Sequence, residues 1–275
     1  MIGLLAVLGG DVSRSFSPLI HEAASRALGY RLAYLGVSAH DSRDFEEKVA
    51  ALQTLGALGA NVTIPFKQDA NVVCGERSEV ARSIGAVNTL VFRGDGVIEG
   101  DNTDGPGLVR CLEELGHERL EAVRILGAGG AARAAAWAAR ASGAGRIEVA
   151  ARRAEQARNL AEPFDAEPVS LDSGIPPTLV ISTLPPDDRT AEDVLERWTD
   201  LGRRPHVLDL AYNEPGAPPP VVLRARAAGL DSSDGFSLLV EQGALSFCRW
   251  TGAAVDPVRE AMWAALETWE PVTVS

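Results

Sequence analysis

The chain has 275 residues, 46% of them hydrophobic, which is enough for two domains with substantial cores. Its formal net charge of −12 argues against nucleic-acid binding, because no basic stripe is present to displace counterions from phosphates. The three cysteines, Cys74, Cys111 and Cys248, are far apart, which argues against disulfides and structural zinc and favours a reducing cytoplasm.

The first hundred residues alternate short apolar segments with amphipathic ones. Residues 1–8 lack a basic leader region and are too short to cross a bilayer, so they predict a first buried strand. Strands are expected over 32–37 and 59–64, with a helix over 42–55 between them. No apolar run reaches the length of about 20 residues that a membrane helix needs, so we expect a cytoplasmic protein without a membrane partner.

Two polar loops in this region carry candidate catalytic groups. Lys67 follows a predicted strand, behind Pro65, which stops the strand and fixes the turn. Asp104 belongs to the glycine-bounded turn 100–105. An ammonium held by a carboxylate can protonate a ketone oxygen during reduction and stabilise the developing alkoxide. Lys67 and Asp104 suit those roles, and on residue type alone the alternative is an exposed lysine and a helix cap.

The stretch 124–133 joins an apolar strand to an alanine-rich helix through a glycine turn. Gly127 permits the tight turn, Gly129 lets the backbone approach a pyrophosphate, and Ala132 keeps helix and strand close. A second strand over 146–150 follows at the spacing of a strand-helix-strand unit. These features predict a dinucleotide site, and a tight turn before a structural helix is the alternative.

The residues after the second strand indicate which dinucleotide is bound. Enzymes that bind NAD usually carry an acid there, whereas a 2′-phosphate needs that acid absent and a cation present. Here Ala151 precedes Arg152 and Arg153, which favours NADP because a guanidinium can hold a phosphate by two hydrogen bonds. Two solvated arginines at the start of a surface helix are the alternative.

Strands over 179–182 and 206–210 continue a parallel sheet, after a helix over 107–115 that leads into the dinucleotide unit. The last helices, over 238–250 and 255–269, have no following strand, so we expect them to pack on the first domain, leaving a cleft between the domains. The fold class predicted is α/β, with two domains. An α/β domain over 1–104 is completed by helices in 238–275, and a doubly wound Rossmann-type domain covers 105–237.

Six motifs together identify a family. They are Ser15–His21, Asn61–Gln68, Gly85–Leu90, Asn102–Gly105, Gly127–Ala132, and Gln242 with Trp250–Gly252. In this order they resemble shikimate dehydrogenases, NADP-dependent enzymes of aromatic amino-acid biosynthesis that reversibly reduce 3-dehydroshikimate to shikimate. The resemblance runs from about residue 10 to 252, and it implies that the first domain binds substrate and the second binds NADP(H).

The resemblance also implies roles for individual residues. The substrate carboxylate would be held by the hydroxyls of Ser15 and Ser17, with Tyr212 beside them. The ring hydroxyls would be bound by Asn61, Asn88, Asp104 and Gln242, and Thr63 would line the pocket. The catalytic pair would be Lys67 and Asp104. Cofactor contacts would come from Gly127, Ala128, Gly129, Gly130, Ala131, Ala132, Arg152, Arg153, Thr183 and Gly235. Many neutral hydrogen bonds suit a small polyhydroxy acid, because each one rejects analogues that leave a buried partner unsatisfied.

Several positions differ from the family pattern. The usual Asn-Arg-Thr of the 2′-phosphate clamp is Ala-Arg-Arg at 151–153, so Arg153 is expected to replace the lost polar contacts. The loop 182–188 contains two prolines and two acids, and Ser237 stands where glycine usually meets the nicotinamide. Arg14 stands where histidine is usual, and it either strengthens carboxylate binding or points to solvent.

Two other functions remain open at this point. A paralogue acting on quinate or an aminoshikimate would share the Lys-Asp pair, although Ser17 favours shikimate. A catalytically silent NADPH-binding regulator would bind nucleotide without turnover, but it would not need a proton-transfer pair. The expected partner is a small-molecule substrate, and the expected assembly is a monomer or homodimer.

Overall fold

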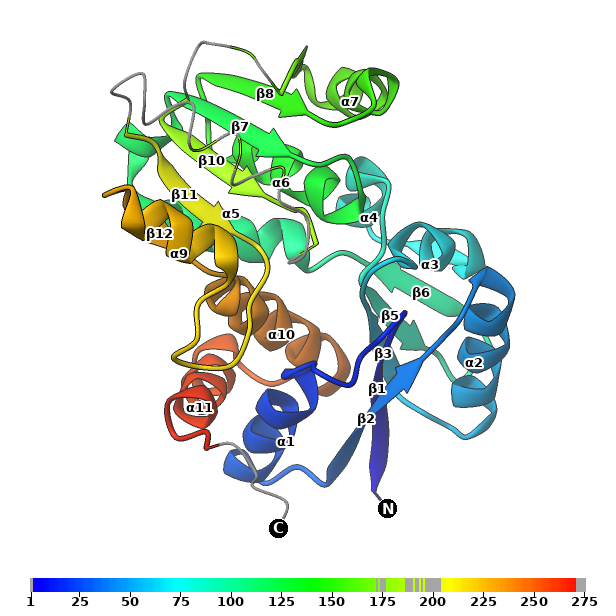
Figure 1. Cartoon of the computed structure of the whole chain (residues 1–275). Coiled ribbons are helices and arrows are strands. Elements are labelled where there is room, and N and C mark those ends of the chain that lie inside the picture. Colours follow the sequence, from blue (N-terminus) through cyan, green and yellow to red (C-terminus); the bar gives the residue numbers. More distant parts are fainter. Residues whose placement is uncertain are drawn as a thin grey trace. The chain divides into compact units, whose positions relative to one another are not determined.

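The structure is a computed structural model that describes residues 2–171, 173, 177–185, 190, 193, 195 and 204–270. The chain divides into two compact units, one made of Met1–Thr103 with Leu239–Ser275 and the other of Asp104–Leu238. Each unit contains a six-stranded sheet with helices (Figure 1). The predicted class, an α/β protein with a Rossmann-type second domain, is confirmed by this architecture.

The first unit is built on a mixed sheet in the order β2-β1-β3-β5-β6-β4. Strand β1 pairs in parallel with β2 and β3, whereas β5 is antiparallel to both β3 and β6. Its elements are β1 (Gly3–Gly9), α1 (Ser17–Ala27), β2 (Leu32–Ser38), α2 (Ser42–Thr54), β3 (Gly59–Val62), α3 (Lys67–Val73), β4 (Glu76–Arg77), α4 (Glu79–Ile84), β5 (Thr89–Phe92) and β6 (Ile98–Asp101).

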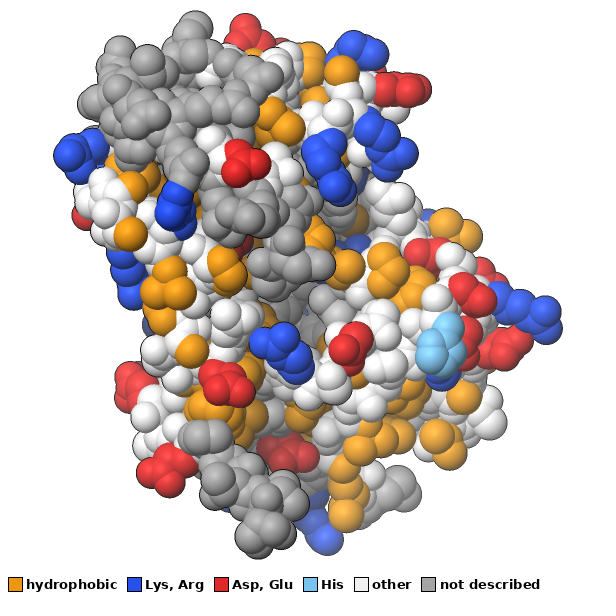
Figure 2. Space-filling model, in the orientation of Figure 1, with side chains coloured by type: hydrophobic (Ala, Val, Ile, Leu, Met, Phe, Trp, Pro, Cys, Tyr) orange, Lys and Arg blue, Asp and Glu red, His pale blue; other side chains and the backbone are white. Residues whose placement is uncertain are grey.

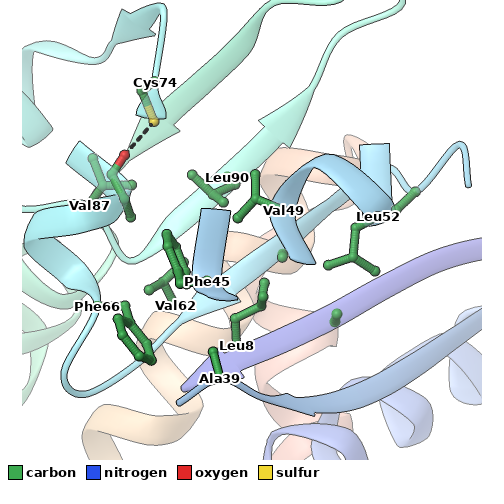
Figure 3. Close-up of a cluster of buried hydrophobic side chains, with 14 of the residues drawn as sticks. Leu8, Ala39, Phe45, Val49, Leu52, Val62, Phe66, Cys74, Val87 and Leu90 are labelled. Carbon is green, nitrogen blue, oxygen red and sulfur yellow. Dashed lines mark hydrogen bonds between the residues drawn. The ribbon is translucent and has the colours of Figure 1, made fainter. Parts of the chain in front are cut away.

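Strand β1 is buried on both faces, as its uninterrupted apolar sequence predicts. Ala6 and Leu8 belong to the core cluster that includes α2, while Leu5 and Val7 belong to a separate cluster, because alternate strand residues face opposite sides of a sheet. Figure 3 shows the first cluster, in which Phe45 and other α2 side chains point toward the strands.

The second unit is a parallel sheet in the order β9-β8-β7-β10-β11-β12. The strand order, counted from β7, is 3-2-1-4-5-6, which is the doubly wound order of dinucleotide-binding folds. Its elements are α5 (Asp104–Leu115), a 3₁₀ turn (His117–Leu120), β7 (Ala122–Leu126), α6 (Gly130–Ala141), β8 (Arg146–Ala150), α7 (Ala154–Ala161), a 3₁₀ turn (Glu162–Phe164), β9 (Glu167–Val169), β10 (Leu179–Ser182), β11 (His206–Asp209), α9 (Pro220–Ala227) and β12 (Ser232–Ser233).

The two C-terminal helices are α10 (Phe236–Thr251) and α11 (Val255–Glu267). From Leu239 onward they belong to the first unit, where α11 packs beside α1 (Figure 1). The Trp250 indole nitrogen of α10 donates to the Leu90 carbonyl of β5 at 2.9 Å, which fixes α10 against the sheet.

Several predicted boundaries differ from the observed ones, and two of these differences bear on the candidate site. Strand β3 ends at Val62 rather than residue 64, because the chain then turns and the Phe66 amide donates to the Thr63 carbonyl. Helix α5 begins at Asp104 rather than residue 107, because Pro106 fits the first turn, where an amide donor is not needed. Asp104 therefore lies in a helix and not in the preceding turn.

The surface mixes charges of both signs. On the face in Figure 2, basic and acidic side chains are interspersed and no basic band crosses it. None of the helices in the described part of the chain is long and apolar enough to cross a membrane.

Candidate active site

The proposed dinucleotide site lies at the switch point of the parallel sheet, where β7 and β10 are neighbours. Ligands of doubly wound sheets bind outside the carboxyl ends of the strands at this point. Gly127 follows β7 with a φ of +117°, and a Cβ there would lie 2.3 Å from the Thr183 hydroxyl that follows β10. Thr183 in turn donates to the Leu126 carbonyl at 2.8 Å. The turn therefore requires glycine for both its conformation and its contact with Thr183.

The remaining residues of the turn leave space and backbone amide donors for a bound anion. Gly129 is the N-cap of α6, and the space that its Cβ would occupy is open to 4 Å. Gly130 and Ala131 begin the first turn of α6, and Ala132 is fully buried within the second unit. Helix α6 has 12 residues, so its amide donors and dipole favour a pyrophosphate at this end.

Arg152 lines two pockets at the carboxyl end of β8. One, of about 290 Å³, also includes Gly127, Ala128 and Arg153. The other, of about 390 Å³, includes Arg158 and Ser170. No acidic side chain lines either pocket among the described residues, so the chemistry suits the 2′-phosphate of NADP and not an unphosphorylated ribose.

The end of β11 contributes another close backbone contact. A Cβ on Gly235 would lie 2.2 Å from the Leu210 carbonyl, so glycine is needed where this segment passes β11. Asp209, the last residue of β11, is 1% exposed, and burial raises the pKa of its carboxyl to about 6. Tyr212 stacks on Phe236 with ring centroids 5.1 Å apart. Of the loop that departs from the family pattern, Asp187 and Asp188 lie outside the described residues.

In the first unit, Lys67 opens α3 and is half-buried. Its carbonyl accepts from the Val87 amide at 2.9 Å, which ties α3 to the segment before β5. Asp104, the first residue of the second unit, is only 5% exposed. Lys67 is therefore not exposed, whereas the position of Asp104 at the start of α5 still agrees with the helix-cap alternative.

Asn88 fixes the residue that precedes Asp104. Its Oδ1 accepts from the Thr103 amide at 2.8 Å, and its Nδ2 donates to the Thr103 hydroxyl at 3.0 Å. The Thr89 hydroxyl also donates to Oδ1, at 3.0 Å. Asn88 is 2% exposed, so this buried network fixes the backbone and hydroxyl of Thr103 within the first unit.

Tyr212 belongs to the second unit, whereas the other predicted substrate residues lie in the first unit. Asn61 of β3 is buried and accepts from the Tyr34 hydroxyl at 2.7 Å. Gln242 of α10 donates to the Leu239 carbonyl at 2.8 Å, and Thr63 follows β3 half-buried. The Ser15 hydroxyl accepts from the Ser17 amide at 3.2 Å, which defines the turn before α1.

Two further side chains of this region were left open by the sequence. Arg14 is exposed, which agrees with the solvent-facing alternative. His21 is fully buried and stacks on Tyr34 with centroids 4.3 Å apart; burial lowers the pKa of its imidazole to about 3. A structural role therefore fits His21.

Residues 7–90 match the family model of the shikimate dehydrogenase substrate binding domain. The NADP(+) shikimate dehydrogenase of Moorella thermoacetica is 37% identical, with 96% of this chain and 95% of the relative covered. The chain belongs to the shikimate dehydrogenase family. Within this family, the enzyme of Citrifermentans bemidjiense is also 37% identical, with 90% of this chain and 89% of the relative covered.

Solved structures of the family share the fold. The Thermus thermophilus shikimate 5-dehydrogenase in complex with NADP(H) and shikimate has a TM-score of 0.80 at 30% identity, covering 97% of this chain and all of the other. A Corynebacterium glutamicum quinate dehydrogenase in complex with NAD has a TM-score of 0.79 at 27% identity, covering 96% and 99%.

The sequence did not single out three polar residues near Asn61, namely Tyr34, Thr89 and Ser246, or the buried Asp209 at the end of β11. Tyr34 lies within an apolar strand, where a tyrosine is read as core, and Ser246 lies within an amphipathic helix. Thr89 was quoted only as part of a family motif. Asp209 at the end of β11 carried a detectable signal, because an acid that ends a buried strand lies at the functional edge of a parallel sheet.

Proposed function

We propose that this chain catalyses the NADP-dependent, reversible reduction of 3-dehydroshikimate to shikimate. The observation that carries the proposal is family similarity over nearly the full chain, combined with a pocket at the end of β8 whose described lining includes Arg152 and Arg153 and no acidic side chain. In this proposal the first unit binds the substrate and the second binds the cofactor.

The residues present fit NADP(H). Gly127, Gly129 and the amino end of α6 would receive the pyrophosphate, Arg152 with Arg153 would hold the 2′-phosphate, and Thr183 and Gly235 would border the cofactor. When bound, this cofactor supplies the hydride of the reduction.

Lys67 and Asp104 would handle the proton. During reduction the Lys67 ammonium donates a proton to the ketone oxygen, and in the reverse direction the neutral amine takes the proton from the hydroxyl. The Asp104 carboxylate would favour the ammonium form and accept a hydrogen bond from a ring hydroxyl. A positioned acid of this kind typically contributes about 10²–10⁴-fold to the rate.

The lysine content of the chain supports this role. Of its 26 lysines and arginines, only Lys48 and Lys67 are lysines. Lys48 donates to the Ser38 carbonyl and to Asp44, which is a structural role. Arginine cannot give up a proton at physiological pH, so proton transfer gives a reason for lysine at position 67 in a chain that otherwise uses arginine.

Substrate recognition would use neutral polar groups. Ser15, Ser17 and Tyr212 would hold the carboxylate, while Thr63 lines the pocket. Ring hydroxyls would be bound by Asn61, Asn88, Asp104 and Gln242. A buried amide that loses its hydroxyl partner costs binding free energy, which gives selectivity against deoxy analogues.

Quinate is the second candidate substrate. Two observations favour testing quinate. The chain is similar to a quinate dehydrogenase solved with NAD, and the 2′-phosphate clamp lacks two polar groups at Ala151 and Arg153. A turnover assay separates both candidate substrates from each other and both activities from a silent nucleotide-binding regulator.

The test is the initial rate of nicotinamide reduction by the purified protein with shikimate or quinate, each with NADP or NAD. Turnover that is fast only with shikimate and NADP supports the proposal. Faster turnover with quinate or NAD assigns the other branch, and nucleotide binding without any turnover would leave only the regulator.

We further propose that the protein acts in the cytoplasm as a monomer or homodimer. Cys74, Cys111 and Cys248 are not joined in disulfides, which suits a reducing compartment. Light scattering of the purified protein would give the assembly, and a mass above that of a dimer would contradict it.

A further inference from the structure

Arg124 is a fully buried cation in the middle of β7. Its side chain is 0% exposed and lies beside Glu148 of β8, whose side chain is 3% exposed. Arg124 Nε donates to Glu148 Oε2 at 2.7 Å, and Arg124 Nη2 lies 2.6 Å from the same oxygen. The two residues are register partners on neighbouring parallel strands, so their charges balance each other directly across the sheet.

The Arg124 guanidinium also reaches the segment that follows β9. Its Nη1 donates to the Ser173 carbonyl at 3.2 Å, and its Nη2 donates to the Ser173 hydroxyl at 3.4 Å. The Ser173 amide donates back to the Ser170 carbonyl at 3.0 Å, which closes a turn. Because β8 lies between β9 and β7, this segment crosses one face of the sheet to reach Arg124.

Leu171 of the same segment packs on that face, nearer the carboxyl ends of the strands. It packs against the core cluster that includes Leu126 and Ala150. These two residues follow Arg124 and Glu148 by two positions, and strand residues two apart point to the same face. Leu171 also lines both pockets at the carboxyl end of β8. Apolar packing therefore attaches the segment beside the pockets, and the guanidinium attaches it farther along.

Stability alone does not account for a charged pair at this place. The cost of desolvating two buried charges offsets most of their attraction, so apolar side chains of similar volume would stabilise the sheet as well. An apolar side chain at position 124 would have no donor for the Ser173 carbonyl. The contact that distinguishes arginine from an apolar residue is therefore the one to the segment after β9.

We propose that Arg124 is a positioning residue for the cofactor, which holds the segment after β9 on the sheet so that Leu171 forms a fixed wall of the pockets. The inference rests on the cofactor assignment of the proposed function. An apolar wall serves the nucleoside that NADPH and NADH have in common, whereas Arg152 would serve the 2′-phosphate that only NADPH carries. Loss of the Arg124 contact should therefore weaken the binding of both nucleotides.

The test is fluorescence titration with NADPH and with NADH of wild type and of the variant that combines Arg124→Met with Glu148→Leu. This variant removes both buried charges at similar volume, so its midpoint of urea unfolding should not fall. The dissociation constants of both nucleotides should rise about threefold to tenfold, the effect of one lost hydrogen bond. KM for shikimate should stay unchanged, because the proposed substrate site belongs to the other unit.

Arg140→Met is the matched control, since Arg140 lies in the same unit with its side chain 58% exposed. It should leave both dissociation constants unaltered. If circular dichroism shows that the double variant does not fold, Arg124→Lys replaces it. Lysine keeps a positive charge for Glu148 but lacks the planar fork that reaches Ser173 as well, so the same increases are expected.

A cycle with Leu171→Ala tests whether Arg124 acts through Leu171. Leu171→Ala by itself should raise both dissociation constants. In that background, the replacement of Arg124 and Glu148 should raise them little further, because the wall that Arg124 positions is already missing.

Unchanged dissociation constants in the folded variant would overturn the inference. Increases of the same size with and without Leu171 would overturn it too, because Arg124 would then act independently of that wall. A rise for NADPH alone would assign Arg124 to phosphate binding instead. Wild-type protein that binds both nucleotides but turns over neither shikimate nor quinate would overturn the proposed function and leave this inference standing, whereas binding of neither nucleotide would overturn both.

Discussion

A few hydrogen-bonded pairs fix the orientations of the side chains in the candidate site. Asn88 uses both ends of its amide on Thr103, and Asn61 uses its oxygen on Tyr34. A buried amide has few ways to satisfy its donors and acceptors, so each pairing restricts the next. The residue types could be chosen from the sequence, but their donor and acceptor roles could not.

Replacing Lys67 with arginine tests proton transfer without removing the positive charge. Lys67→Arg should lower kcat for shikimate oxidation about 10²-fold or more, since guanidinium does not release its proton. The dissociation constant of NADPH, measured by fluorescence titration, should stay the same. Lys48→Arg is the control and should retain kcat. Wild-type kcat in Lys67→Arg would refute the proton-transfer role.

His21 should make the fold sensitive to acid. Its folded-state pKa is about 3, below the unfolded value near 6.5, because burial disfavours the imidazolium. Its contribution is therefore complete above pH 6.5 and is lost as pH falls toward 3. Between pH 7 and 4.5 this loss is on the order of 2–3 kcal/mol.

The measurement is urea unfolding of wild type and His21→Leu at pH 7 and 4.5. The variant should lose less unfolding free energy on acidification than the wild type does. Comparison of the two proteins cancels the carboxylates that they share. Equal losses would show that His21 does not titrate in this range.

At the scale of elements, the β7-turn-α6 unit was predictable because its requirements are local. A tight turn at Gly127, an open N-cap at Gly129 and a buried Ala132 all follow from neighbouring residues. The boundaries of β3 and α5 were less predictable. Turn formation after Val62 and tolerance of Pro106 in a first helical turn moved them by two and three residues.

Arg152 should decide between the two nicotinamide cofactors. Arg152→Ala should raise KM for NADP by about 10–100-fold, the cost of losing charged hydrogen bonds, and leave KM for NAD and shikimate near their wild-type values. Arg140→Ala, which removes an exposed ion pair with Asp165, is the control. A similar change in KM for NADP and NAD would show that Arg152 does not contact the 2′-phosphate.

At the scale of the molecule, the C-terminal segment from Leu239 completes a unit whose first part ends at Thr103. Gly59 of β3 shows how closely: a Cβ there would lie 2.2 Å from the Trp250 indole nitrogen and 2.1 Å from the Leu90 carbonyl. The contact leaves no room for a side chain, so α10 and the sheet are fitted to each other.

Gly59→Ala should therefore destabilise the protein by about 2–3 kcal/mol, because Trp250 or β5 must shift. The check is the midpoint of urea unfolding, followed by tryptophan fluorescence. Gly94→Ala, at a position with open space for a Cβ, should be neutral or slightly stabilising. Equal midpoints for the two variants would mean that the α10 contact adapts without cost.

The sequence by itself determined the fold class, the order of the elements, the dinucleotide turn, and Lys67 and Asp104 as candidates. These depend on apolar periodicity and turn chemistry, which act over a few residues. Tertiary structure alone decided that Tyr34 donates to Asn61 and that Gly59 faces Trp250. Those contacts link residues far apart in the chain, and only close packing and the need to satisfy buried polar atoms select them.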